Sequence, residues 1–277
     1  VAAVLQRLLA PDTTTSDHPF VDVDAGWQQV PVAWMTATDS ITGALSNTSQ
    51  LNVFGDPSLK AVQTDSATEV IIFTGKGRAF TVGLDLKELG GETPADTAVN
   101  KDLGKAMLQV NKPIIGAING YAITGGFELA LMCDFMIASE NAKFADTHAR
   151  VGVVPGWGLS QRLPRLIGIN RAKELSLTGN FLDAQTACAW GLVNRVVAAD
   201  ELLATAEQLA KDIVSTEPVT RNAMRHIMDA GWHTSLTEGL ATERKANREH
   251  AKTEVRAEKV AARRAQIQQR GRSQSDD

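Results

Sequence analysis

The chain has 277 residues, 43% hydrophobic and 22% charged, so it is long and apolar enough to bury a sizeable core. This composition excludes disorder or a fibrous repeat for most of its length. With 28 basic and 32 acidic residues the formal charge is −4, a balance that does not favour nucleic acid as the partner.

The two cysteines, Cys133 and Cys188, lie in apolar stretches and form neither a disulfide framework nor a metal-ligand spacing. We interpret both as core thiols in a reducing, cytoplasmic setting. The apolar run at 113–133 contains Glu128 and several glycines, which favour turns over one membrane-spanning helix. We therefore expect no membrane segment, and residues 1–10 are a poor signal peptide.

The first predicted strand spans residues 30–37. The second, at 69–75, is nearly all apolar in its middle, as strands covered on both faces are, and should be central in its sheet. A third strand is predicted at 112–120, with a helical pattern at 100–110 as the crossover before it. This alternation of strand and helix predicts an α/β fold.

Downstream, the pattern changes to short helices at 160–166 and 171–177. An Asp183-capped segment and a strand at 192–197 follow. From residue 200 to residue 277 the chain is predicted to be all-helical, with Pro218 near the first turn of one helix. We divide the chain into an extension (1–19), a core (20–199) and a helical C-terminal region (200–277).

The helical region carries a charge asymmetry. Residues 241–272 hold ten basic and four acidic residues, a net charge of +6. Such a segment is either a solvated helix face with i,i+4 ion pairs or a contribution to binding a phosphate-bearing ligand. The sequence leaves both interpretations open.

Three familiar catalytic signatures are incomplete. The GKGRAF segment has Phe80 where a dinucleotide fingerprint needs its last glycine, and Ser160 lacks the second flanking glycine of a nucleophile elbow. The histidines are scattered without metal-ligand spacing. Nucleotide redox, serine hydrolase and metalloenzyme chemistry are therefore not predicted.

Two glycine-containing turns directly follow buried strands, GRAFTVGLDLKEL after Thr74 and NGYAITGGFELALMCD after Ile118. Ligands bind at such strand ends in open α/β sheets. A helix is predicted to begin directly behind Gly125 and Gly126, and its N–H groups would point at a ligand carbonyl. Glu128, in the first turn, is a candidate catalytic acid or base, or else only complements the helix dipole, and the glycines are alternatively explained by close packing.

From about residue 20 to residue 197 the chain resembles the crotonase (enoyl-CoA hydratase/isomerase) superfamily. GRAFTVGLDLKEL is similar to its AFxxGxDL segment. Three further blocks follow in the family's order and spacing: KPIIGAINGYAITGGFELALMCDFMIASENAKFA, PGWGLSQRLPRLIG and ACAWGLVNRVV. The resemblance implies a crotonase-like spiral of ββα turns with an all-helical C-terminal trimerisation region. It also implies an acyl-CoA thioester substrate and no cofactor, since coenzyme A is part of that substrate.

The resemblance implies an oxyanion hole made by the backbone N–H groups of Leu84 and Gly125. Glu128 matches the first of the two glutamates that share the water in the hydratases, but the second position is His148. His148 either divides the acid and base roles with Glu128 or only lines the pocket. Asp146, two residues earlier, is a weaker candidate, because we expect its side chain to face the opposite way if the segment is extended.

The resemblance also implies that backbone around 41–45 and 82–85 holds the adenine of coenzyme A. Gly43 stands where the family has asparagine, and the basic residue expected just before it is missing. Trp157 either walls the acyl pocket or is a core residue. The predicted substrate-binding residues are Ile41, Gly43, Ala44, Val82, Gly83, Asp85 and Trp157. Candidate phosphate contacts are Arg263, Arg264, Arg270 and Arg272.

We predict an enoyl-CoA hydratase-like lyase that adds water to a 2-enoyl-CoA. The alternatives are another crotonase reaction, namely that of an isomerase, a hydrolase or a different lyase, or a catalytically silent acyl-CoA binder. We also predict a homotrimer or a dimer of trimers, with no nucleic acid or membrane partner. The apolar helix positions behind that prediction are Leu202, Leu209, Ile213, Ala223 and Ile227, and the alternative is that they pack on the chain's own core.

Overall fold

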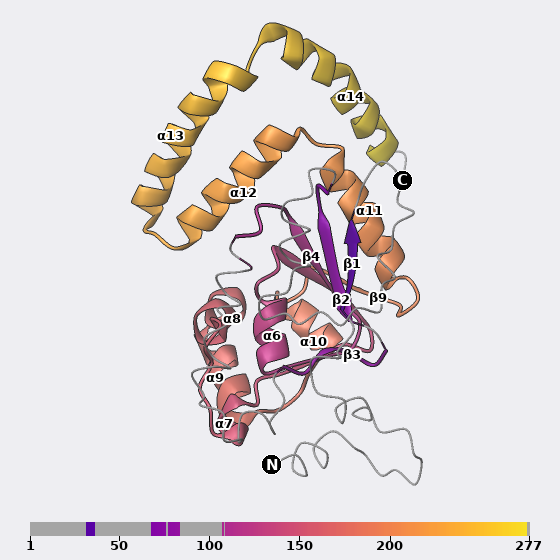
Figure 1. Cartoon of the computed structure of the whole chain (residues 1–277), viewed down its shortest axis with the longest axis vertical. Coiled ribbons are helices and arrows are strands. Elements are labelled where there is room, and N and C mark those ends of the chain that lie inside the picture. Colours follow the sequence, from indigo (N-terminus) through magenta and orange to yellow (C-terminus); the bar gives the residue numbers. More distant parts are fainter. Residues whose placement is uncertain (1–31, 37–67, 76, 84–106, 108, 276–277) are drawn as a thin grey trace. The chain divides into compact units, whose positions relative to one another are not determined.

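A computed structural model describes residues 32–36, 68–75, 77–83, 107 and 109–275. The described strands are β1 (Val32–Thr36), β2 (Ile71–Gly75), β3 (Ala79–Thr81), β4 (Ile114–Ile118), β5 (Tyr121–Ile123), β6 (Phe135–Ser139), β7 (Lys143–Ala145), β8 (Leu182–Asp183) and β9 (Val196–Val197). The described helices are α6 (Gly125–Ala130), α7 (His148–Val151), α8 (Leu159–Ile167), α9 (Ile169–Thr178), α10 (Ala184–Ala189), α11 (Leu202–Val214), α12 (Pro218–Trp232), α13 (Leu236–Glu254) and α14 (Ala257–Ser275) (Figure 1). These residues divide into two compact units between Val214 and Ser215.

The described strands of the first unit form two sheets, and from β2 to β7 successive strands alternate between them. One has the order β1-β2-β4-β6-β9 and the other the order β3-β5-β7-β8. The strands run parallel except at β1 and β8, which pair antiparallel with their neighbours. Each pair of consecutive strands from β2 to β7 gives one strand to each sheet, and α6 follows β5. The predicted α/β fold, a spiral of ββα turns, is confirmed.

Both faces of the larger sheet are covered. Ile71 and Phe73 of β2 belong to a core cluster shared with α6, α8, α9 and α10. Their neighbours Val70 and Ile72 belong to a second cluster on the opposite face, together with Ile115 of β4. Successive side chains of a strand point to opposite faces, so a strand covered on both sides must be apolar throughout. This requirement explains the continuous apolar runs in the sequence.

α11 covers the second face of the larger sheet. Leu202, Ala206 and Ala210 recur every four residues and are buried against the strands, and Leu209 and Ile213 are partly buried beside them. The expectation that Leu202, Leu209 and Ile213 face another subunit is therefore wrong. The helix packs on its own sheet, since two alanines on its inner face allow close approach.

Most predicted strands are found. Those at 30–37, 69–75 and 112–120 correspond to β1, β2 and β4, although β4, not β2, holds the middle position of the described sheet order. The strand expected at 192–197 is reduced to β9, because only Val196 and Val197 pair with β6. The helical pattern at 100–110 lies largely outside the described residues.

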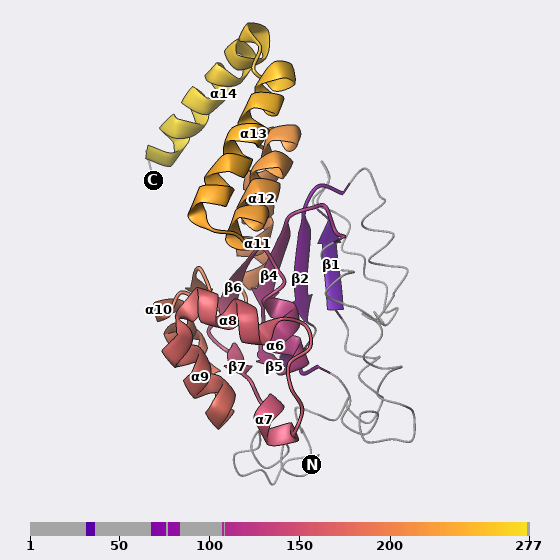
Figure 2. The ribbon, with the colours of Figure 1, turned by 90° about the vertical axis from the view of Figure 1, so that its left-hand side faces the viewer.

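The predicted helix signals also hold. The helices expected at 160–166 and 171–177 are α8 and α9, which lie side by side in Figure 2. The Asp183 side chain accepts the Thr186 N–H at 2.9 Å and caps α10. Pro218 stands in the first turn of α12. No described helix has the combination of length and apolar character needed to span a bilayer.

The side chain of Asn119, which follows β4, holds the turn between β2 and β3. Its Oδ1 accepts the Gly75 N–H at 3.0 Å. Its Nδ2 donates to the carbonyl oxygens of Gly77 at 3.0 Å and Ala79 at 3.2 Å. One ββα turn is thus bonded to the preceding one through an amide side chain as well as through the strand ladders.

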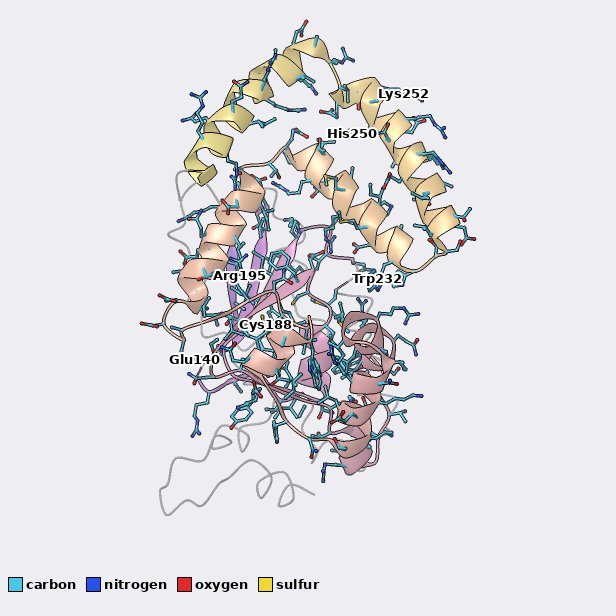
Figure 3. All side chains as sticks on the ribbon, turned by 180° about the vertical axis from the view of Figure 1, so that it is seen from behind. Glu140, Cys188, Arg195, Trp232, His250 and Lys252 are labelled. Atoms are coloured by element: carbon cyan, nitrogen blue, oxygen red, sulfur yellow. The ribbon has the colours of Figure 1, made fainter. Side chains whose placement is uncertain are left out.

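The second unit contains α12, α13 and α14. α12 and α13 pack against each other, and the His250 imidazole of α13 lies 3.0 Å from the Thr220 hydroxyl of α12 (Figure 3). Ser235 and Glu238 form a capping box at the start of α13. The described residues from 200 on contain helices and turns only, so the all-helical prediction is confirmed for them. The domain boundaries proposed at 19/20 and 199/200 stay predictions.

Candidate active site

The two glycine-containing turns meet in the structure. Each includes a short strand that the sequence did not predict, β3 in the first and β5 in the second, and these strands pair in parallel. A Cβ built on Gly126 would lie 1.9 Å from the Thr81 carbonyl oxygen, and one built on Gly83 would lie 2.9 Å from the Gly125 nitrogen. Glycine is therefore required by contact between the two backbones. The paired glycines are therefore explained by close packing of the two backbones. This packing brings the two predicted ligand-binding turns together.

Helix α6 begins at Gly125 and carries Glu128 in its first turn, as predicted. The Glu128 side chain is buried, with the residue 2% exposed. Its Oε1 accepts two backbone N–H groups, from Trp157 at 2.8 Å and from Leu159 at 3.2 Å. A buried carboxylate needs such donors. Glu128 is therefore fixed in place by the segment that leads into α8.

His148 lies across from Glu128. Its Nε2 is 3.5 Å from Glu128 Oε2, and the residue is 6% exposed. The two residues are 20 positions apart in the sequence. The parallel pairing of β5 and β7 brings the ends of these strands together, and the two residues follow these ends. The distance is within the reach that a shared acid and base role requires. Their catalytic roles stay a prediction.

Asp146 also belongs to this cluster, contrary to the expectation that it faces away. Its Oδ1 lies 2.6 Å from His148 Nδ1 and accepts the His148 backbone N–H at 3.2 Å. The expectation was wrong because residues two positions apart in an extended segment lie on the same face, not on opposite faces. The segment also turns here, since Thr147 has φ −97° and ψ 11° and α7 begins at His148, and the two side chains meet.

The charges of the cluster favour a protonated imidazole. Burial lowers the pKa of His148 and is the largest single influence, but the hydrogen bonds and negative charges of Asp146 and Glu128 outweigh it and raise the pKa to about 9. Burial likewise opposes the ionised form of Asp146, yet hydrogen bonds from His148 and Ser176 hold the pKa of Asp146 below its usual value. At neutral pH we therefore treat His148 as an imidazolium beside two carboxylates.

A pair of threonines joins the two halves of the site. The Thr124 hydroxyl, just before α6, is hydrogen-bonded to the Thr147 hydroxyl, just before α7. Thr124 has φ 54°, a left-handed conformation that is costly for a β-branched residue. Its backbone N–H donates to the Ala145 carbonyl at 2.9 Å. Thr124 thereby connects the start of α6 to the segment that carries His148.

The Trp157 ring covers the start of α6. A Cβ built on Gly125 would lie 2.9 Å from Trp157 Cζ3. The tryptophan is partly buried and packs against the larger core cluster. Its position supports both interpretations made from the sequence, a core contact and a wall beside the site.

Several predicted residues cannot be placed. Leu84 of the expected oxyanion hole lies outside the described residues, as do the predicted substrate contacts Ile41, Gly43, Ala44 and Asp85. Val82 is described and packs against the small cluster of Ile123 and Ala145. Gly83, which precedes Leu84, lies against Gly125.

Two of the arginines proposed as phosphate contacts, Arg263 and Arg270, have partners inside the second unit. Arg263 lies 3.4 Å from Glu217 and 3.7 Å from Glu254, and Arg270 donates to the Ser215 hydroxyl at 2.8 Å. Arg264 and Arg272 are exposed. For Arg263 the structure favours the interpretation of helix ion pairs.

The described part of the chain contains no group of three or more His, Cys, Asp or Glu side chains suited to hold a metal ion. The described groups of the site are the buried side chains of Glu128, Asp146 and His148. Sequence reasoning named Asp146 only as a weaker candidate that faces away, and it missed the Thr124–Thr147 contact. The run Asp146, Thr147, His148 is the signal that could have found them, because polar residues of this kind are unusual directly after a buried strand.

The chain is similar to known proteins over most of its length. The sequence profile of a family described as Enoyl-CoA hydratase/isomerase matches residues 47–268. A probable peroxisomal enoyl-CoA hydratase 1 of Arabidopsis thaliana is 44% identical over 193 residues, which are 69% of this chain and 72% of the relative. A probable enoyl-CoA hydratase of Rhizobium meliloti is 40% identical over 75% of this chain and 81% of its own length. The crystal structure of an enoyl-CoA hydratase from Bacillus anthracis superimposes with a TM-score of 0.71 at 38% identity, covering 76% of this chain and 83% of that one.

Proposed function

The chain belongs to the enoyl-CoA hydratase/isomerase family, and we propose that it adds water across the double bond of a 2-enoyl-CoA to give a 3-hydroxyacyl-CoA. The observation that carries this proposal is the buried pair of Glu128 and His148, 3.5 Å apart beside the start of α6. Hydration needs one group to take a proton from water and another to give a proton to carbon. The pair supplies both.

We assign the base role to Glu128 and the acid role to His148. Glu128 Oε1 is engaged by two backbone N–H groups, so Oε2, which faces His148, is the oxygen that takes the proton of water. A water at about 2.8 Å from both Glu128 Oε2 and His148 Nε2 fits their separation. The water oxygen bonds to C3 while the imidazolium gives its proton to C2, and the carbon–carbon π bond is consumed.

After the addition Glu128 holds a proton and His148 lacks one. A proton passing between Oε2 and Nε2 restores the starting charges without any further group. The negative charge that develops on the thioester oxygen is assigned to the N–H groups of Gly125 and Leu84, worth roughly 3 kcal/mol per donor. The contact of Gly83 with Gly125 supports this pairing. The proposed chemistry uses no cofactor, because coenzyme A is part of the substrate.

Among the alternatives, hydrolysis of an acyl-CoA needs a base to activate water against the thioester carbonyl. The Asp146 and His148 pair has the arrangement for that role, but the raised pKa of His148 leaves little neutral imidazole at pH 7. Isomerisation by Glu128 alone, another lyase reaction and silent acyl-CoA binding are weaker proposals, because the second acid or base group is present and adjacent. The activity assay described next distinguishes these alternatives from hydration.

The test is to mix the purified protein with short, medium and long 2-enoyl-CoAs and follow the loss of enoyl-thioester absorbance. Glu128→Gln should lower the rate about 10²-fold or more while keeping an oxygen for the Trp157 and Leu159 N–H groups. Glu140→Gln, which changes an exposed glutamate after β6 (Figure 3), is the matched control and should keep the parent rate. Binding of acyl-CoA by calorimetry without turnover would support the silent binder instead.

We further propose a homotrimer or a dimer of trimers. Support comes from the second unit, where Met224, Met228 and Trp232 of α12 recur every four residues and are exposed, as are Leu236 and Leu240 of α13. A monomer by light scattering at micromolar concentration would contradict this proposal. A cytoplasmic location is also proposed, on the two cysteines, although related proteins carry peroxisomal and mitochondrial names.

A further inference from the structure

Asp146 is a buried carboxylate to which the proposed hydration assigns no step. The residue lies just after β7 and is 1% exposed. Its Oδ1 contacts His148 twice, at the ring Nδ1 (2.6 Å) and at the backbone N–H (3.2 Å). The Ser176 hydroxyl of α9 is a further hydrogen-bond partner. Burying an ionised carboxylate is costly, so this placement demands a physical explanation.

The two ring nitrogens of His148 have different partners. An ionised carboxylate only accepts hydrogen bonds, so the 2.6 Å contact requires a hydrogen on Nδ1. Nε2 is then the nitrogen that can release and regain a proton, and it lies 3.5 Å from Glu128 Oε2. A flip of the ring would exchange these contacts and break the short one.

We propose that Asp146 is the positioning residue of this site: it keeps the proton on His148 Nδ1 and holds the ring so that Nε2 faces Glu128 and the reacting carbon. The role of His148 in turnover rests on the proposed hydration. The control of the ring by Asp146 does not, since it is a property of the protein without substrate.

The charged groups that act on His148 are Glu128 from α6 and Asp146 from its own segment. α9, which packs against α7, presents the uncharged Ser176 hydroxyl to Asp146. The charged residues of α9 that neighbour Ser176, Lys173 and Glu174, are exposed. Removing the Asp146 charge while keeping its shape should therefore lower the pH at which His148 loses its proton.

The test is Asp146→Asn, examined with and without substrate. In the parent, kcat/KM should fall as the pH rises through about 9, when His148 loses the proton that it donates. In the variant, the high-pH limb of the profile, where kcat/KM falls, should move to lower pH by about one unit or more. In addition, kcat should fall about tenfold with KM little changed. Asp134→Asn, which changes an aspartate that accepts the Ile114 N–H at the start of β4, should leave the limb in place.

The second readout needs no activity. Histidine-selective NMR on the whole protein, with the His148 signal identified by its loss in His148→Gln, gives the titration of the ring and the nitrogen that carries the proton. Asp146→Asn should lower the pH at which the His148 ring titrates. It should also allow the neutral ring to carry its proton on Nε2 in place of Nδ1. If the protein hydrates nothing but the titration shifts as described, the hydratase proposal fails and the positioning role stands.

The proposal is overturned if Asp146→Asn leaves the His148 titration and tautomer as in the parent. Should this variant fail to fold by circular dichroism, Ser176→Ala removes one support of Asp146 and is measured instead. A shift in the same direction, smaller than for Asp146→Asn, supports the proposal, and an unchanged titration overturns it. A merely structural role for Asp146 would change stability without moving either readout.

Discussion

The ring of Trp157 packs over Gly125, the residue at which α6 begins, so closely that a single methyl group at Gly125 would lie 2.9 Å from Cζ3. The same methyl group would lie 3.3 Å from the Cα of Gly83. Gly125 is therefore packed against both an aromatic ring and a neighbouring backbone. Its N–H is one of the proposed donors to the thioester oxygen, so this packing fixes the position of that donor.

Gly125→Ala should displace either the ring or the donor. We expect kcat/KM to fall by about 10²-fold, because the proposed oxyanion interaction depends on a fixed position. Steady-state kinetics on the best 2-enoyl-CoA give the measurement. Gly156→Ala, next to the same tryptophan but with no heavy atom within 4 Å of the added Cβ, is the control. A variant at Gly125 that matches this control would contradict the proposed donor.

Thr124 has a strained backbone and a side-chain hydrogen bond to Thr147. Two substitutions separate the effects of these two features on stability. Thr124→Ala keeps the φ of 54° but removes the bond to Thr147, so it should lower the free energy of unfolding by about 1–2 kcal/mol. Thr124→Gly also loses the bond, but it relieves the strain. Urea unfolding should therefore rank the glycine variant as the more stable of the two. The opposite ranking would mean that the strain is negligible.

The cap at α10 should contribute measurably to stability. Asp183 accepts the backbone N–H and the hydroxyl of Thr186. Asp183→Ala should cost about 1 kcal/mol of unfolding free energy, whereas Asp183→Asn keeps a capping oxygen and should cost much less. Thermal melts of both variants test this. Equal melting temperatures for the two would show that the cap is not what matters there.

The buried cluster should make stability depend on pH. The pKa of His148 is raised from 6.5 to about 9 in the folded chain. Its contribution is therefore fully present below pH 6.5 and is lost as the pH rises through about 9, on the order of 1–3 kcal/mol. Asp146, whose pKa is lowered, contributes above its ordinary value of 3.8, and that contribution is lost as the pH falls through the lowered pKa.

The measurement is urea unfolding of the parent and of His148→Gln at several pH values from 6 to 10. The difference between the two should shrink as the pH rises across that window. A constant difference would mean that His148 has the same pKa folded and unfolded.

Much of the fold was predictable because local patterns determine it. Continuous apolar runs located β2 and β4, and Asp183 and Pro218 marked helix starts. The short strands of the second sheet were missed, since three residues next to a glycine turn carry too little periodicity to separate them from a loop.

The site was predicted in part. Glu128 was found from its place behind paired glycines, and His148 from the resemblance. Asp146 was misjudged because the alternation of side chains was misapplied: residues two positions apart share a face in an extended segment, so Asp146 should have been expected beside His148. The turn at Thr147 was not predicted either. The N–H partners of Glu128 come from a loop about 30 residues away, which no local pattern indicates.

The amide of Asn119 gives the order of assembly a physical basis. Its bonds to Gly75, Gly77 and Ala79 can form only when the strand from the later part of the chain is already beside the earlier one. The turn between β2 and β3 should thus gain its protection from hydrogen exchange late, together with β4 and not as soon as β2 forms. Asn119→Ala should then open this turn to exchange while the helices of the second unit exchange as before.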